Sequence, residues 1–153
     1  MNARSRTDDE GLLDAVRVVM RLARIIERCC DEAGLTMPQY RALNHAARGK
    51  RRSYELARFS AVSRAAMSAL TTGMLKAGLL ERNDAEGDGR GVEFGATKHG
   101  LDVLASLEDR LVERFAEVLG PAAASLTSLD GAAIEAALDR EVDREFGTLY
   151  PSS

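Results

Sequence analysis

Few residues in this chain are of types that could perform catalysis. Its 153 residues include two histidines, His45 and His99, and two adjacent cysteines, Cys29 and Cys30. An enzyme needs a nucleophile beside a base, a metal site or a glycine-rich phosphate loop. The sequence contains no string typical of any of these. We therefore expect no enzymatic activity, no catalytic residue, no cofactor and no metal.

The cysteine pair suggests a different chemistry, the sensing of oxidants. Neighbouring side chains on a helix point about 100° apart, so Cys29 and Cys30 cannot easily form a disulfide with each other. Both end an apolar helical pattern, which favours buried and unreactive thiols. Sensing of peroxide or of an electrophile by either thiol stays an alternative.

Residues able to bind phosphate are concentrated in the middle of the chain. Residues 36–99 hold 11 Lys and Arg against 6 Asp and Glu, whereas residues 100–153 hold 4 against 11. A basic segment attracts nucleic-acid phosphates, and an acidic segment is repelled by them. The net charge of −3 therefore conceals an asymmetry that would orient the protein on DNA. Taken alone, it also fits charges scattered over solvated faces.

Two short helices joined by a tight turn would position these residues. The first helix covers 53–59, and we expect Ser53 to cap it. After a turn at 60–62, the second helix opens at its N-cap Ser63 and closes at Gly78. In a helix-turn-helix of this kind the second helix enters the major groove of DNA.

A two-stranded hairpin follows the second helix. Residues 79–83 and 91–96 read as short strands, and the loop 84–90 between them is rich in Gly and Asp, as hairpin tips are. Such a wing can reach the adjacent minor groove, where Arg90 would read the groove width. Asp88 is placed to orient the Arg90 guanidinium by a charge-assisted hydrogen bond.

The outward face of the second helix carries unusually short side chains. An alanine offers only apolar contact to a thymine methyl group, so we expect Arg64, Ser68 and phosphate contacts to contribute most of the binding. The predicted DNA contacts are Arg52, Ser63, Arg64, Ala65, Ser68, Ala69, Thr72, Lys76, Asp88 and Arg90.

Longer helices surround this lobe. Residues 9–33 form a helix that is apolar on two ridges, so it must be covered both by its own domain and by a partner chain. Thr36 and Thr97 cap further helices that run to about 48 and 119, and a capping-box pattern at 127–130 opens a last helix to about 146. We expect one mainly α domain over 1–153, with about six helices and a two-stranded wing. No signal peptide or membrane span is seen, which favours the cytoplasm.

The order of these elements resembles the MarR family, the multiple-antibiotic-resistance regulators. Each matching string is weak alone, but five in the right order and spacing are specific. They are LTMPQY at 35–40, ELARFSAVSR at 55–64, GLLER at 78–82, DGR at 88–90 and TKHG at 97–100.

The resemblance implies an obligate homodimer. Residues 9–33 and 98–146 would interlock as a helical dimerisation region, and 36–97 would be the winged helix-turn-helix lobe. It also implies a transcriptional repressor on a pseudo-palindromic operator, released by a small aromatic or lipophilic ligand, or alternatively by thiol oxidation. A winged module that binds a protein partner instead of DNA is the other alternative.

The resemblance places the ligand between the dimerisation region and the winged lobe. Arg24 is the expected partner of a ligand carboxylate. The residues expected to line that crevice are Met20, Arg24, Met37, Tyr40, Asn44 and His99.

Two residues depart from the family pattern inside the helix-turn-helix. Members usually carry a Leu and a Gly where this chain has Ser60 and Ala61. Ser60 is expected to lose apolar packing. Ala61 is expected to cost about 1 kcal/mol relative to Gly if the turn requires a positive φ.

Overall fold

The computed structural model describes residues 6–84 and 92–149, with side chains described for 8–83 and 92–144. The elements run α1 (Arg6–Glu32), α2 (Met37–Ala47), β1 (Arg51–Arg52), α3 (Ser53–Ser60), α4 (Arg64–Lys76), β2 (Leu80–Asp84), β3 (Val92–Ala96) and α5 (Lys98–Leu119). A 3₁₀ turn (Gly120–Ala122), α6 (Ala123–Thr127) and α7 (Gly131–Leu149) complete the chain. The expected mainly helical winged-helix fold is confirmed.

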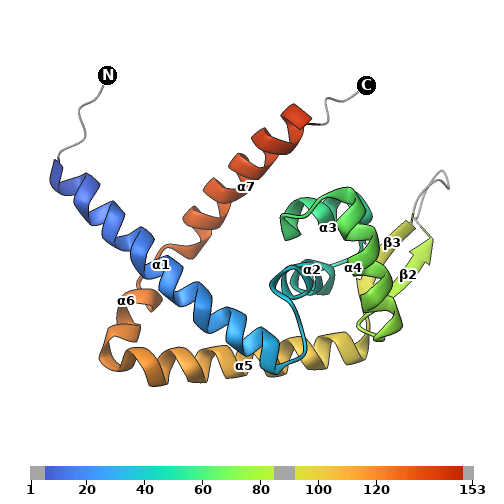
Figure 1. Cartoon of the computed structure of the whole chain (residues 1–153), viewed down its shortest axis with the longest axis horizontal. Coiled ribbons are helices and arrows are strands. Elements are labelled where there is room, and N and C mark those ends of the chain that lie inside the picture. The colour runs from blue at the N-terminus through green and yellow to red at the C-terminus, as the bar shows by residue number, and fades with distance from the viewer. Residues whose placement is uncertain (1–5, 85–91, 150–153) are drawn as a thin grey trace.

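The helices fall into two groups. Helices α2, α3 and α4 pack with the small sheet into a lobe, while α1 and α5 extend away from it as long rods and α7 runs back toward α3 (Figure 1). Helices α1 and α5 contact each other, and α5 also contacts α2 and β3 at the base of the lobe. The helix-turn-helix therefore sits at one end of a helical frame. None of the described helices has the length and apolarity to span a membrane.

The sheet has three strands rather than the expected two. Strand β3 lies in the middle of the order β1-β3-β2, and both pairs are antiparallel. Arg51 pairs with Phe94, so the short basic segment between α2 and α3 forms an edge strand. Two consecutive arginines show no alternation of apolar and polar residues, and their strand conformation comes from pairing with β3.

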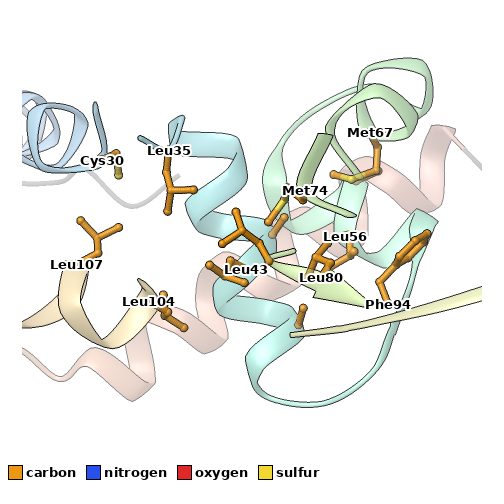
Figure 2. Packing of buried hydrophobic residues seen from close by; sticks show 14 of the residues in the cluster. Cys30, Leu35, Leu43, Leu56, Met67, Met74, Leu80, Phe94, Leu104 and Leu107 are labelled. Carbon is orange, nitrogen blue, oxygen red and sulfur yellow. The ribbon is translucent and has the colours of Figure 1, made fainter. Parts of the chain in front are cut away.

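One apolar cluster runs through both groups of helices. In the lobe it includes Leu43, Leu56, Met67 and Met74, each fully buried (Figure 2). The same cluster continues through Cys30, Leu35, Leu104 and Leu107 to the junction of α1, α2 and α5. This continuity means that the lobe and the base of the frame share one core.

Three helix starts are capped as the sequence indicates. The Thr36 hydroxyl accepts from the Gln39 N–H at 3.3 Å, and the Gln39 side chain accepts from the Thr36 N–H at 2.8 Å, which completes a capping box. Ser63 accepts from the Ala66 N–H at 3.2 Å, and Thr97 accepts from the Gly100 N–H at 2.9 Å. Each hydroxyl satisfies an N–H that has no partner within its helix.

Two other helix starts differ from the expectation. Ser53 lies inside α3, whose N-cap is Arg52; there the Glu55 carboxylate accepts from the Arg52 N–H at 2.7 Å. Helix α7 begins at Gly131 and is capped by Asp130, which accepts from the Ala133 N–H at 3.0 Å. The 127–130 pattern does not open the helix at its first residue, because the Thr127 hydroxyl donates back to a carbonyl of α6.

The buried face of α4 combines apolar and polar residues. Met67 and Met74 are buried, whereas Ala66 and Ala77 are exposed and Thr71 takes an inner position. The Thr71 hydroxyl donates to the Met67 carbonyl at 2.9 Å. A hydroxyl satisfied within its own helix can be buried at little cost, which sequence periodicity does not reveal.

The turn between α3 and α4 contains the strain expected of it. Ala61 has φ 55 and ψ 43, the left-handed region in which a Cβ is unfavourable. The Val62 N–H donates to the Ala57 carbonyl at 3.2 Å across this turn. Ser60 beside it is 1% exposed, and no described group hydrogen-bonds its hydroxyl. Both departures from the family pattern therefore weaken the helix-turn-helix.

Ala61→Gly should raise the free energy of unfolding by about 1 kcal/mol, because glycine adopts a positive φ without the Cβ penalty. Chemical denaturation at a fixed protein concentration measures the change. The same exchange at Ala69, an exposed site within α4, is the matched control and should cost about 1 kcal/mol. Destabilisation by both substitutions would show that the turn holds no such strain.

Candidate nucleic-acid interface

The outward face of α4 is the candidate reading surface. The helix rests on α3 and β2 through its buried methionines, which turns its other side to solvent. All seven residues predicted on or beside this face are exposed: Ser63, Arg64, Ala65, Ser68, Ala69, Thr72 and Lys76. The structure thus brings these seven together on one helix.

This face of α4 offers few side-chain groups that can hydrogen-bond to bases. The Thr72 hydroxyl donates to the Ser68 carbonyl at 2.8 Å, so its proton is already used inside the helix. Ala65 and Ala69 leave a low ridge between the cationic ends Arg64 and Lys76. A ridge without long side chains lets the helix backbone approach the floor of a groove closely. It offers methyl contacts and few bidentate hydrogen bonds.

Cationic side chains also gather at the edge strand β1. Arg52 is exposed there, with its Nε 4.0 Å from a carboxylate oxygen of Glu93 on β3. Lys50 and Tyr54 are exposed on either side of it and could bind phosphate, yet neither was predicted. The run Lys50-Arg51-Arg52 was the available signal.

The wing tip cannot be placed in the same detail. Asp88 and Arg90 lie outside the described residues, so their predicted contacts stay predictions. The strands below the tip are described, and they pair from Leu80 with Ala96 out to Asp84 with Val92.

A comparison with known families finds a match in this part of the chain. The sequence model of the MarR family matches residues 33–91, which run from α2 to the wing. The helix-turn-helix lobe is thus similar in sequence to the MarR family.

Solved structures extend the similarity to the whole chain. AbsC of Streptomyces coelicolor is 22% identical with a TM-score of 0.62, over 97% of this chain and 98% of that one. A MarR family transcriptional regulator of Silicibacter pomeroyi is 17% identical with a TM-score of 0.65, over 95% of each chain. NadR in complex with 4-hydroxyphenylacetate is 23% identical with a TM-score of 0.62, over 93% and 98%. The curated proteins compared give no match.

The six residues predicted to line a ligand crevice do not line one cavity of this chain. Arg24 borders a cavity of about 440 Å³ between α1 and α5, and His99 borders a second of about 540 Å³. Tyr40 and Asn44 border a third of about 430 Å³ between α2, α3 and α7. These three cavities do not bring the residues together, and the predicted crevice between the dimerisation region and the winged lobe stays a prediction.

The two predicted methionines lie outside all three of these cavities. Met20 is 67% exposed on α1, and Met37 packs half-buried against the core with its sulfur 3.9 Å from the Cys30 sulfur. The resemblance had grouped these two residues in one crevice. In the structure α1 extends away from α2 toward its N-terminus (Figure 1).

The two thiols are poorly placed for redox sensing. Cys29 is 3% exposed and Cys30 is fully buried. Burial, followed by the charges of Cys29, Asp31 and Glu27, raises the pKa of the Cys30 thiol above its ordinary value. Oxidants react with the thiolate, so this environment opposes the alternative of a thiol-based switch at Cys30.

Proposed function

We propose that this chain is a MarR-family regulator, a homodimeric repressor of a pseudo-palindromic operator, and that α4 and the wing of each chain read one half-site. The exposed face of α4, with its short side chains, carries the proposal. Two such helices related by a twofold axis reach successive major grooves about 10 base pairs apart. A repressor then acts by occupying the operator until an effector lowers its affinity.

Unburied apolar surface on the long helices supports the dimer. The N-terminal half of α1 exposes Val19 at 63% and Met20 at 67%, and α5 exposes Val112 at 70%. Burial of apolar surface stabilises by about 25 cal/mol per Å², so a second copy that covers these helices gains free energy. The other large exposed apolar residues of these helices and α7 are Leu12, Leu13, Val16, Val18, Leu101, Val118, Ile134 and Leu138.

Val19→Asp should raise the dissociation constant of the dimer by at least about a hundredfold, because an unpaired carboxylate buried at an interface costs about 3–5 kcal/mol. Light scattering over a dilution series measures the mass. Arg21→Asp changes the polar face of the same helix and is the matched control. A Val19→Asp chain that stays dimeric like the control would place the interface elsewhere.

The predicted DNA contacts divide by chemistry. Arg64 stands at the N-terminus of α4, where an arginine can reach a guanine edge or a phosphate. Ser68, Ala65 and Ala69 would approach the bases. Arg52, Ser63, Thr72 and Lys76 would bind phosphates, and Asp88 would hold Arg90 in the minor groove.

Arg64→Ala should weaken binding to a duplex selected from random DNA by about tenfold or more, as expected for loss of a base or phosphate contact. Fluorescence anisotropy at several salt concentrations measures it. Arg17→Ala is the charge-matched control, since Arg17 lies on α1 in an ion pair with Asp14 at 2.7 Å. Equal losses in both variants would mean that only net charge matters, and no loss in either would favour a protein-binding module.

An aromatic or lipophilic effector is the proposed trigger. The NadR structure is a complex with 4-hydroxyphenylacetate, an aromatic acid. In the present chain the cavity between α1 and α5 is bordered by Arg24, Arg28, Arg110 and Arg114 and also by three glutamates. Arg110 and Arg114 pair with Glu32 and Glu117, so Arg24 and Arg28 are the candidate partners of a carboxylate. Met20, Met37, Tyr40, Asn44 and His99 lie outside this cavity.

Aromatic carboxylates at millimolar concentration should weaken DNA binding severalfold, and Arg24→Ala should reduce that response. Anisotropy at constant ionic strength, with acetate as the charge control, measures both effects. Arg21→Ala, on the same helix but outside the cavity, should respond like the unmodified chain. A broad panel of aromatic acids without effect would count against this class of effector.

A further inference from the structure

Helix α4, the proposed recognition helix, ends close to the start of the long helix α5, although β2 and β3 lie between them in the sequence. Strand β3 pairs with β2 up to its last residue, where Ala96 lies opposite Leu80. The next residue, Thr97, is already the N-cap of α5. On the other strand, only the Ala77-Gly78-Leu79 corner separates α4 from β2. The end of α4 and the start of α5 are therefore held side by side.

Thr97 joins these two ends through hydrogen bonds. Its hydroxyl accepts from the Gly100 N–H at 2.9 Å and donates to the Gly78 carbonyl at 2.5 Å. Its backbone N–H donates to the Leu79 carbonyl at 3.1 Å. One side chain thus caps α5 and binds the corner at which α4 ends.

The corner is itself tied back to the recognition helix. The Gly78 N–H donates to the Leu75 carbonyl at 3.0 Å, and the Leu79 N–H donates to the Met74 carbonyl at 3.0 Å. Gly78 has φ 70, which closes the helix in the usual left-handed way. A displacement of Gly78 or Leu79 would therefore move the last turn of α4.

Gly100 makes the contact close. A Cβ at this position would lie 2.2 Å from the Leu79 carbonyl oxygen and 3.1 Å from a Leu43 methyl group. The first neighbour is backbone and cannot rotate away. Glycine is required here for space, because any side chain would push α5 away from the corner and from α2.

We propose that Thr97 and Gly100 are positioning residues for DNA recognition: they form a rigid joint that fixes the angle between α4 and α5. In the proposed dimer, α5 belongs to the dimerisation region, so the joint sets the separation of the two recognition helices. This inference rests on the proposed function for its effect on DNA. The joint itself is a property of one chain.

The length of α5 makes small errors at the joint matter. Its 22 residues span about 33 Å at 1.5 Å per residue. A tilt of about 10° at the joint would displace the far end of α5, relative to the lobe, by about 6 Å over that length. Base pairs are about 3.4 Å apart along the DNA axis. A loose joint would therefore blur the half-site spacing by more than one base pair.

Substitutions at Thr97 separate its capping of α5 from its hydrogen bond to the Gly78 carbonyl. Serine keeps both functions of the hydroxyl. An ionised aspartate is a good N-cap acceptor but cannot donate to the Gly78 carbonyl. Thr97→Asp should therefore leave α5 capped and loosen only the joint, and Gly100→Ala should force the two segments apart.

The joint is tested by pulsed electron spin resonance on the full-length chain. Spin labels at Lys76→Cys on α4 and Asp109→Cys on α5 report the interhelix distance, and excess unlabelled chain keeps the signal within one subunit. The unmodified and Thr97→Ser chains should give one narrow distribution. Thr97→Asp and Gly100→Ala should give distributions at least about twice as broad, or shifted. The chain without added cysteines controls for labelling of Cys29 and Cys30.

Unchanged distance distributions in the folded Thr97→Asp chain would overturn the proposal. This variant alone decides the test if Gly100→Ala fails to fold.

A second measurement uses duplexes whose selected half-sites are moved apart one base pair at a time. For the unmodified and Thr97→Ser proteins, affinity should peak sharply at one spacing. For Thr97→Asp, the ratio of affinities between the best and the neighbouring spacings should be smaller by about tenfold or more. Failure of every protein, including the unmodified one, to bind DNA would instead refute the proposed function. The spin-label distances would still test the joint.

Discussion

Apolar surface that one chain cannot cover is the constraint on which the rest of this structure depends. The C-terminal part of α1 enters the common core through Cys29 and Cys30, but its N-terminal half exposes a series of large apolar side chains. The winged lobe has a core of its own around Leu43, Leu56 and Met67. A partner chain, as proposed, would cover this surface of the helical frame, whereas the lobe does not need one for its core. A second copy on the frame would leave two lobes free to bind DNA.

The lobe presents a helix, α4, whose short side chains allow a close approach to DNA but offer few hydrogen bonds to bases. The small residues on α4 restrict hydrogen bonding to bases, and the Thr72 hydroxyl proton is used within the helix. In the proposed complex, sequence preference would come from a few contacts, from the shape of the grooves and from the fixed separation of two half-sites. The strained Ala61 and the buried, unpartnered Ser60 hydroxyl lie behind this face. They cost stability without altering its chemistry.

Local rules predicted most of the fold and most of the α4 surface. Caps such as Thr36, Ser63 and Thr97 depend on neighbours three residues away, and the exposed face of α4 follows from helical spacing. Features set by distant partners were not predicted. Strand β1 exists because of β3, and the six expected ligand residues, which are divided among α1, α2 and α5, do not border one cavity. The role of Gly100 depends on the Leu79 carbonyl, a contact that sequence spacing does not contain.

The most direct test of the account is selection of binding sites from a pool of random-sequence duplexes at physiological salt. The account predicts enrichment of one inverted repeat with half-sites about 10 base pairs apart, bound by two chains. A pool that stays random after repeated rounds, or an enriched site bound by a single chain, would contradict it.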